Sequence, residues 1–513
     1  MAASPAQLEP PAAAAPLRTD TLADSVLILL GLTVVQRLVG FCRAVLFCRW
    51  LDAEQLGRWD MAFSFLLLAA PLAVLAVPGA FGRYVELYRQ QGQLRTFLRR
   101  TTALCAVMAA AAMVVVLAGR RWFSQLIFGT ADQTELVALL AASLIAVVAY
   151  NFLVELFTAL RNVRLVSVMQ LVGSLAFAAL GIGLLLGWRD SAASVVVAYG
   201  GSCLIAAAVA AWHLHRTWRA LPQLGEPIRQ RALWSRLGPF AAWVLLAAAL
   251  CNLFEVVDRY MIIHFSTMPP DEALRQVGNY HSSRVVPLLL VSIAAMLGTM
   301  ITPHLSNDWE AGRRELVAAR LRLFIKLLGL AMTTAAVAVL VAAPLLFGVA
   351  FKGKFAGGLA VLPWTLTYCT WFGLLLVAEN YLWCAEKARL SALALLVGLL
   401  ANVGLNLLLL PRLGLLGAVL ATTAANLIAL GLICWFNHLL GFRTDRGLRV
   451  VLALPICVCL GPYLAMLVVA AVLLEAVFSD RLFTIEEKRE ISDALEEYIG
   501  RIRKLRPAGG AVE

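Results

Sequence analysis

The chain has 513 residues, of which 61% are hydrophobic and only 14% are charged, and its mean hydropathy is +0.83. A soluble protein of this length would carry roughly a quarter charged residues, so the composition excludes a water-soluble protein. The net charge of +12 does not indicate a nucleic-acid partner, because the Lys and Arg residues fall in short connections between apolar stretches.

The chain begins with a segment rich in Ala and Pro, and residues 1–24 are predicted to form a disordered tail. Twelve apolar stretches follow, and each approaches the roughly 20 residues that a helix needs to cross a bilayer. They predict spans at about 25–48, 59–82, 101–119, 135–160, 165–187, 192–212, 237–263, 284–303, 323–348, 358–384, 390–410 and 414–437. We therefore expect an all-α integral membrane protein with 12 core transmembrane helices.

A polar stretch at residues 213–236 divides these spans into two sets of six, a division typical of transporters that are built from repeats. We expect an N-lobe over 25–212, a cytoplasmic linker over 213–236 and a C-lobe over 237–438, with the two six-helix lobes around a central cavity. The connections are too short to hold a separate soluble catalytic domain.

The distribution of positive charge predicts the orientation. If the N-terminus is cytoplasmic, alternating connections place 22 Lys and Arg residues on the cytoplasmic side and 9 on the other side. Membrane proteins show this bias towards the cytoplasm. It also supports twelve spans, because one missed span would scramble the alternation.

A further apolar stretch at 450–478 is long for one helix and short for two full spans, and Gly461-Pro462 lies inside it. One kinked span would give thirteen spans and an external C-terminus, whereas a short hairpin would return the chain to the cytoplasm. Residues 479–513 are predicted to form a polar amphipathic helix and tail, for which we favour the cytoplasm.

Arginines lie inside the predicted spans, where an ionisable residue normally faces a wet cavity or a partner. Arg37 lies about 16 Å into the first span, near the midplane, and Arg43 lies about 9 Å further on. Arg284 opens the predicted eighth span. Two or three guanidinium groups at one cavity would suit a phosphate or diphosphate. Because Arg37 and Arg43 point about 120° apart on an ideal helix, the cavity must be broad or the helix must bend, for example at Gly40.

Acidic residues also lie inside the predicted spans, and they are candidates for proton or sodium coupling or for ion pairs: Glu155, Glu255, Asp258 and Glu379, with Arg259 beside them. Glu255 and Arg259 are spaced i, i+4, so we expect them to neutralise each other. Glu155 is expected to pair with a neighbouring helix, and Glu379 lies near a span end and could reach the interface. The ten cysteines lie in apolar stretches without a metal-type CxxC, and we predict no metal site and no catalytic residue.

Several short motifs carry a family resemblance. The segments with these motifs are RLVGFCR at 37–43, DRYMI at 258–262, VGNY at 277–280 with Arg284, LGT at 297–299, TPHLS at 302–306, FKGKFA at 351–356 and PRLGLLGA at 411–418. Together they resemble bacterial polysaccharide flippases of the multidrug/oligosaccharidyl-lipid/polysaccharide exporter superfamily, and in part the lipid II flippase branch. The resemblance covers roughly residues 25–440.

The resemblance implies alternating access around a central cavity, with cavity arginines at Arg37, Arg43 and Arg284. Two positions depart from the lipid II flippase pattern. Lipid II flippases often have an Asp before the eighth-span Arg, where this chain has Ser283, and an acidic residue after the first-span Arg, where it has Ala44. These departures favour a carrier of polysaccharide units over a lipid II flippase.

We therefore expect a flippase that moves an undecaprenyl-diphosphate-linked saccharide across the bacterial inner membrane. It would use no cofactor, with coupling to H⁺, Na⁺ or the membrane potential left open. Its expected partners are the bilayer, the lipid-linked substrate and polysaccharide-assembly proteins. The alternatives are a multidrug antiporter, a lipid II flippase and, less favoured, a polysaccharide polymerase. A polymerase needs a large outer loop, and the longest predicted one, about 264–283, is too short.

Overall fold

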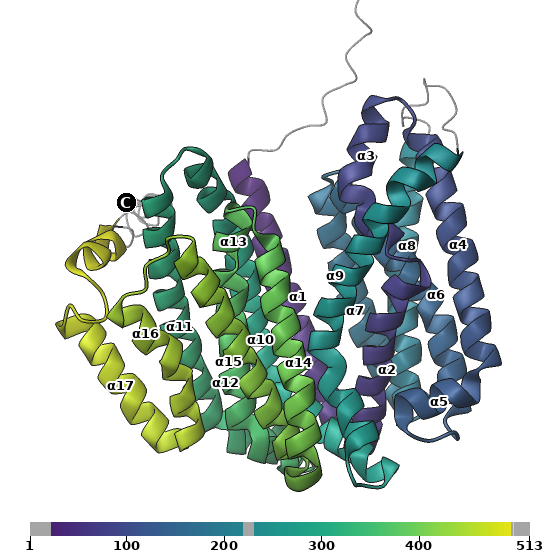
Figure 1. The fold of residues 1–513 in the computed structure, drawn as a ribbon. Helices are drawn as coiled ribbons and strands as arrows, with labels where there is room; N and C mark the ends of the chain where they lie inside the picture. The colour runs from purple at the N-terminus through teal and green to yellow at the C-terminus, as the bar shows by residue number, and fades with distance from the viewer. Residues whose placement is uncertain (1–21, 219–229, 494–495, 497–513) are drawn as a thin grey trace, which may run out of the picture.

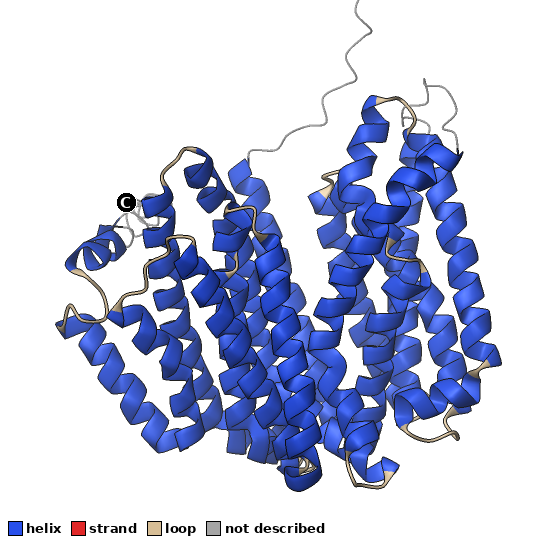
Figure 2. Cartoon of the chain, in the orientation of Figure 1, coloured by secondary structure: helices blue, strands red, loops and turns tan. Residues whose placement is uncertain are grey.

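The computed structural model describes residues 22–218, 230–493 and 496, and this part of the chain is helical without any strand (Figure 2). Twelve of its helices are long and apolar enough to cross a membrane, which confirms the predicted fold class. The elements are α1 (Leu22–Trp50), α2 (Ala53–Ala73), η1 (Val77–Ala80), α3 (Phe81–Gln90), α4 (Leu94–Ala118), α5 (Arg120–Phe128), α6 (Thr134–Ala159), α7 (Val163–Gly187), α8 (Ala192–Thr217), α9 (Gln230–Phe265), α10 (Pro270–Glu310), α11 (Arg314–Leu345), η3 (Leu346–Ala350), α12 (Ala356–Ala378), α13 (Asn380–Cys384), α14 (Ala388–Leu413), α15 (Leu415–Leu439), α16 (Arg446–Ala453), η4 (Leu454–Leu460) and α17 (Pro462–Phe478).

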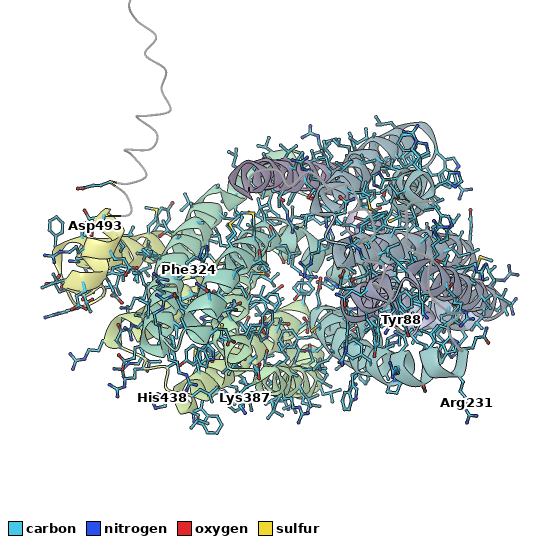
Figure 3. All side chains as sticks on the ribbon, turned by 90° about the horizontal axis from the view of Figure 1, so that it is seen from above. Tyr88, Arg231, Phe324, Lys387, His438 and Asp493 are labelled. Carbon is cyan, nitrogen blue, oxygen red and sulfur yellow. The ribbon has the colours of Figure 1, made fainter. Side chains whose placement is uncertain are left out.

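The helices form two groups, which lie side by side and separate towards the face where α1 begins (Figure 1). We call that face the N-terminal face. We call the first six spans in chain order the N-lobe (α1, α2, α4, α6, α7 and α8) and the next six the C-lobe (α9, α10, α11, α12, α14 and α15). α9 crosses between the groups: its first turns lie beside the N-lobe, where Tyr84 donates a hydrogen bond to the backbone carbonyl of Arg236 at 3.0 Å, and the helix also packs against α14 of the C-lobe. Seen from above, Tyr88 and Arg231 lie in one group, and Phe324, Lys387 and His438 in the other (Figure 3). α1 runs between the groups and contacts both α7 and α10.

Several helices extend beyond the apolar stretches that predicted them. α10 begins at Pro270, not at 284, and α11 begins at Arg314, not at 323. Hydropathy marks only the part of a helix that lies in hydrocarbon, whereas intrahelical hydrogen bonding continues through the polar turns outside it. The expected outer connection at 264–283 is therefore wrong, because only residues 266–269 separate α9 from α10.

The second predicted span, 59–82, is shifted and broken. α2 begins at Ala53, where the side chain of Asp52 caps it by accepting a hydrogen bond from the backbone N–H of Gln55 at 2.7 Å. α2 ends at Ala73, and Leu75 and Ala76 then adopt positive φ angles of 47° and 48°. The predicted single span is therefore broken after α2, and η1 and α3 continue the chain.

The lobes meet tightly at the face opposite the N-terminal face. A Cβ atom on Gly57 of α2 would lie 1.9 Å from the carbonyl oxygen of Leu274 in α10, and one on Gly278 would lie 1.8 Å from that of Ala53. The backbones of α2 and α10 therefore touch at a point that only glycine allows. Beside this crossing, Lys354 donates hydrogen bonds at 3.0–3.2 Å to the last carbonyls of α1.

The C-terminal apolar stretch forms a hairpin. α16 and η4 descend along α11 and α12, and α17 returns after the turn at Gly461 (Figure 1). Each limb is about 26 Å long, slightly short of the hydrocarbon thickness of about 30 Å. A Cβ on Gly447 would lie 2.0 Å from the carbonyl oxygen of Leu482, so both ends of the hairpin lie together. The one-span alternative is wrong.

An ion-pair cluster fixes the returning chain. Lys326 of α11 is only 1% exposed, and its ammonium lies 2.6 Å from the Asp445 carboxylate and 2.8 Å from that of Glu487. Residues 485–493 are helical, as predicted for this segment.

Two predicted segments lie largely outside the described residues. The predicted disordered tail falls mostly on residues 1–21, and much of the predicted linker falls on 219–229. Residues 22–24 of the predicted tail already belong to α1.

Candidate functional site

Arg37 stands at the middle of α1, about 22 Å from the start of the helix and about 20 Å from its end. Its exposed side chain lines a cavity of about 290 Å³ between α1 and α10. Val285, Leu288 and Leu289 of α10 form the apolar part of the opposite wall. Within the described residues, the Arg37 guanidinium has neither an ion-pair partner nor a hydrogen-bond partner.

Arg43 lines the same cavity although it lies six residues further along α1. A Cβ on Gly40 would be 3.8 Å from the Arg43 guanidinium, so the Arg43 side chain runs back over Gly40 towards the preceding turn. The two arginines therefore share a cavity without a break in α1. The Arg43 guanidinium also lies 4.1 Å from the ring centroid of Phe177, which is a cation–π contact.

A second cavity, of about 330 Å³, lies between helices of the N-lobe, with His281 of α10 at its edge, and adjoins the first; we call it the N-lobe cavity. The residues that line both cavities are Gln36, Arg43, Ala44, Ser174 and His281. The rest of the N-lobe cavity is lined by Phe47, Trp59, Phe63, Tyr150, Gln170, Gly173, Phe177, Tyr199, Ser202 and Cys203. Neither set of lining residues includes an Asp or Glu, so Arg37 and Arg43 dominate the charge of the joined space.

Aromatic rings form one wall of the N-lobe cavity. The ring centroids of Trp59 and Phe63 are 5.7 Å apart, those of Trp59 and Tyr199 are 5.8 Å apart, and those of Phe177 and Tyr199 are 5.3 Å apart. Most of these contacts are tilted or edge-to-face, the geometry that aromatic side chains prefer. Hydropathy and spacing do not indicate this wall, because its rings come from α2, α7 and α8, which are separate in sequence.

Arg284 does not line either cavity. The eighth span begins at Pro270, so Arg284 lies inside α10 and does not open it, contrary to the prediction. Its side chain is buried, with the guanidinium 3.9 Å from the Glu255 carboxylate and 5.3 Å from the Tyr280 ring centroid. The structure therefore brings two of the three predicted arginines together and places the third in an ion pair.

The expected pair of Glu255 with Arg259 does not form. Arg259 is 2% exposed and pairs at 2.7 Å with Asp60 of α2, which is equally buried. Arg259 also donates to the hydroxyl of Ser64 at 2.9 Å, and His281 of α10 lies 2.9 Å from the second Asp60 oxygen. The i, i+4 spacing permits a pair, but Arg259 faces α2 whereas Glu255 faces Arg284. Asp60 was missed because the predicted span began at 59, which placed it at a membrane edge.

Asp258 is buried in the C-lobe among polar groups from three other helices. Thr422 of α15 donates its hydroxyl to the carboxylate at 2.7 Å, Tyr280 of α10 donates at 3.3 Å, and the amide of Asn406 in α14 donates at 3.3 Å. Asn402 adds a further amide oxygen, 2.5 Å from the Asn406 nitrogen. The sequence identified Asp258 but not the ligands around it.

The remaining two acidic candidates lie apart from these groups. Glu379 follows α12 and is 7% exposed, and its carboxylate accepts a hydrogen bond from Ser391 at 2.7 Å, so its side chain is held inside the protein. Glu155 in α6 is exposed, and within the described part of the chain it has no ion-pair partner, so the expected pairing with a neighbouring helix is absent there.

Comparisons with known proteins agree with this architecture. A sequence model of the family described as "Polysaccharide biosynthesis protein" matches residues 22–308, which is more than half of the chain. No curated protein matches the sequence significantly.

Solved structures share the fold at low sequence identity. The lipid II flippase MurJ in an inward closed conformation has a TM-score of 0.66 and 11% identity, covering 88% of this chain and 99% of that one. An inward-facing multidrug resistance MATE family transporter of the MOP superfamily has a TM-score of 0.59 and 14% identity, covering 79% and 94%. Its outward-facing conformation has a TM-score of 0.56 and 14% identity, covering 80% and 94%.

The fold and the family match lead to one assignment: this chain belongs to the polysaccharide biosynthesis protein family, and it shares the fold of a lipid II flippase and of multidrug transporters.

Proposed function

We propose that this protein translocates an undecaprenyl-diphosphate-linked saccharide across the bacterial inner membrane by alternating access. The observation that carries the proposal is the pair Arg37 and Arg43, which line one cavity at the middle of the membrane span without an acidic lining residue. Removing guanidinium groups from water is costly unless an anion compensates them. A diphosphate supplies that charge and accepts forked hydrogen bonds from arginine.

The walls of the Arg37 cavity also suit a lipid-linked anion. Val285, Leu288 and Leu289 of α10 face the arginines across the cavity, so apolar and cationic surfaces lie next to each other. In our proposal the diphosphate binds at the arginines and the polyprenyl chain remains on the apolar side, in contact with the bilayer.

The closed contact between the lobes supports a cytoplasm-facing state. α2 and α10 touch at Gly57 and Gly278, and Lys354 binds the end of α1, all on the face opposite the start of α1. The bias of 22 positive residues against 9 favours a cytoplasmic N-terminal face. The proposed cycle begins with capture from the cytoplasm and continues with opening of the contact at Gly57 and Gly278.

We further propose that Asp258 couples transport to a proton or a sodium ion. A buried carboxylate is costly without a counter-ion, and hydroxyl and amide oxygens close by are suitable ligands for a hard cation. The group lies in the C-lobe and lines neither cavity, so an ion there would act through the conformation of the C-lobe.

Two alternatives share the fold. The structural similarity to MurJ supports a lipid II carrier, and the similarity to a MATE transporter supports a drug antiporter. A cationic drug would require acidic cavity residues, which neither lining set contains. We propose that the protein is not an enzyme, because the four-residue connection 266–269 offers no outer loop for a polymerase.

The test is transport in proteoliposomes that contain the purified protein and undecaprenyl diphosphate bearing N-acetylglucosamine. Arg37→Ala is expected to reduce translocation at least tenfold, because removal of one partner of a desolvated charge pair typically costs about 2–5 kcal/mol. Arg37→Lys should recover part of the rate, since it keeps the charge but loses the forked geometry.

The matched control is Arg120→Ala, which removes an exposed arginine of α5 outside both cavities. It should transport like the wild type. Undiminished translocation by Arg37→Ala would refute the proposed function, and drug efflux by the wild type without lipid translocation would favour the antiporter.

A further inference from the structure

The N-lobe cavity contains polar groups that the protein itself does not satisfy. Gln170 of α7, Gln36 of α1 and Tyr150 of α6 all line it. Within the described residues, their side-chain amides and hydroxyl make no hydrogen bond. These groups lie at membrane depth, where an unpaired polar group is costly, so the cavity calls for an occupant with its own donors and acceptors.

The aromatic part of the lining has a different character. Trp59, Phe63, Phe177 and Tyr199 form a continuous set of rings, with Trp59 and Phe177 5.7 Å apart. If the rings served packing alone, apolar side chains would complete the space, and the three unpaired polar groups would be unnecessary. An occupant that matches both parts of the lining must have apolar and polar surfaces.

A pyranose ring has this distribution. Its axial C–H bonds form an apolar face that stacks on an aromatic ring, and its hydroxyl groups donate and accept hydrogen bonds at the ring edge. Glutamine amides offer two donors and an acceptor, which suits such an edge. A volume of about 330 Å³ lies at the lower end of the range for small-ligand cavities, so it fits a short saccharide better than a long one.

The position of this cavity relative to the arginines matches the covalent structure of a lipid-linked sugar. Arg43 lies on the boundary between the two cavities, and its guanidinium contacts Phe177 of the aromatic wall. Arg37 lies only in the neighbouring cavity. A diphosphate at Arg37 and Arg43 would therefore place the sugar attached to it directly in the N-lobe cavity.

We infer that the N-lobe cavity is a saccharide-binding subsite, in which Trp59 and Phe177 bind the sugar face and Gln170 and Tyr150 bind its hydroxyl groups. The inference rests on the proposed function, because it takes the cargo to be a lipid diphosphate. It adds a second determinant of substrate specificity: the arginines select the diphosphate, and the N-lobe cavity selects the sugar.

The experiment compares the affinities of two kinds of probe for the purified full-length protein in detergent. One is undecaprenyl diphosphate without a sugar, and the others are the same lipid bearing glucose, galactose or N-acetylglucosamine. At least one of the sugars should increase the affinity tenfold or more over the bare lipid.

The variants are Gln170→Ala and Tyr150→Phe, which remove polar groups without disturbing the ring wall. Each should weaken the best sugar-bearing probe about fivefold, which corresponds to one hydrogen bond, and leave the bare lipid within about twofold. Gln125→Ala, at an exposed position on α5, is the matched control and should change neither affinity.

The outcomes separate the two proposals. If the bare lipid binds and no sugar adds affinity, or if both variants weaken all probes equally, the saccharide subsite is refuted and the proposed function stands. If the protein binds neither the bare lipid nor any sugar-bearing probe, both proposals fail.

Discussion

At the scale of single residues, charges inside the membrane are mostly satisfied by partners that only the tertiary structure reveals. Arg259 pairs with Asp60, and Arg284 faces Glu255. Such pairing is the usual outcome for ionisable groups in hydrocarbon, because an unpaired charge there is costly. Arg37 differs, since it has no partner within the described residues and lines a cavity. This contrast separates a binding candidate from structural charges.

The hydrogen-bonded carboxylate of Asp258 leads to a prediction about coupling. Asp258→Asn keeps the size of the side chain and removes the negative charge that a proton or sodium ion would neutralise. We expect stimulation of transport by a proton or sodium gradient to fall at least about tenfold in the variant, because an amide cannot be protonated at neutral pH and is a weaker ligand for a hard cation than a carboxylate. The measurement is lipid translocation in proteoliposomes with imposed gradients.

The control for this prediction is Asp271→Asn, at an exposed position in the first turn of α10. It should respond to the gradients like the wild type. If Asp258→Asn retains the full response, Asp258 is a structural residue and the coupling proposal is wrong.

At the scale of elements, the crossing of α2 and α10 holds one face of the protein closed. The backbones approach so closely that a Cβ on Gly278 would lie 1.8 Å from the Ala53 carbonyl oxygen. Ordinary contacts of this kind need about 3.5 Å, so any side chain forces the helices apart. The glycine pair therefore determines how tightly the lobes can close at this face.

Substitution at the crossing should shift the conformational equilibrium. Gly278→Ala is expected to move α2 and α10 apart by at least about 1.5 Å and to favour opening of this face. The measurement is the distance between spin labels at Asp190 and Asp271, two exposed positions at this face, in a background without the exposed Cys42 and Cys251.

A matched variant is available in α7. A Cβ atom on Gly183 would meet no neighbouring atom within 4 Å, so Gly183→Ala should leave the label distance unchanged. An equal distance in Gly278→Ala and the wild type would show that the glycine crossing does not control closure.

At the scale of the whole molecule, the C-terminal hairpin determines on which side the chain ends. Gly447, at the start of the hairpin, lies against Leu482, which follows its end. Lys326 binds Asp445, which precedes the hairpin, and Glu487, which follows it. Twelve spans and a hairpin leave both ends of the described chain at the same face. The cluster at Lys326 joins both ends of the hairpin to α11, and removal of one partner would leave an uncompensated buried charge at a cost of about 3–5 kcal/mol.

This topology predicts the behaviour of fused reporters. Green fluorescent protein attached after residue 513 should fluoresce, and alkaline phosphatase at the same site should be inactive, as expected for a cytoplasmic end. Alkaline phosphatase after Thr267, in the turn between α9 and α10, should be active and serves as the opposite control. Active phosphatase at residue 513 would contradict the hairpin.

The sequence alone predicted the class of the protein, its twelve spans and the depth of Arg37 and Arg43, because these depend on local hydropathy and on the fixed rise of a helix. It misplaced the starts of α2 and α10, since polar helical turns outside the membrane carry no hydropathy signal. As a result it missed Asp60 and placed Arg284 at the wrong depth.

Only the tertiary structure decided which charges meet and which remain free to bind a ligand. The partner of Arg259 lies about 200 residues away in sequence, and the rings of the N-lobe cavity come from three helices. Helical periodicity gives the direction of a side chain on its own helix, but the neighbour in that direction depends on how the helices pack. For that reason the two arginines were visible in the sequence, whereas the cavity that joins them to a sugar-sized space was not.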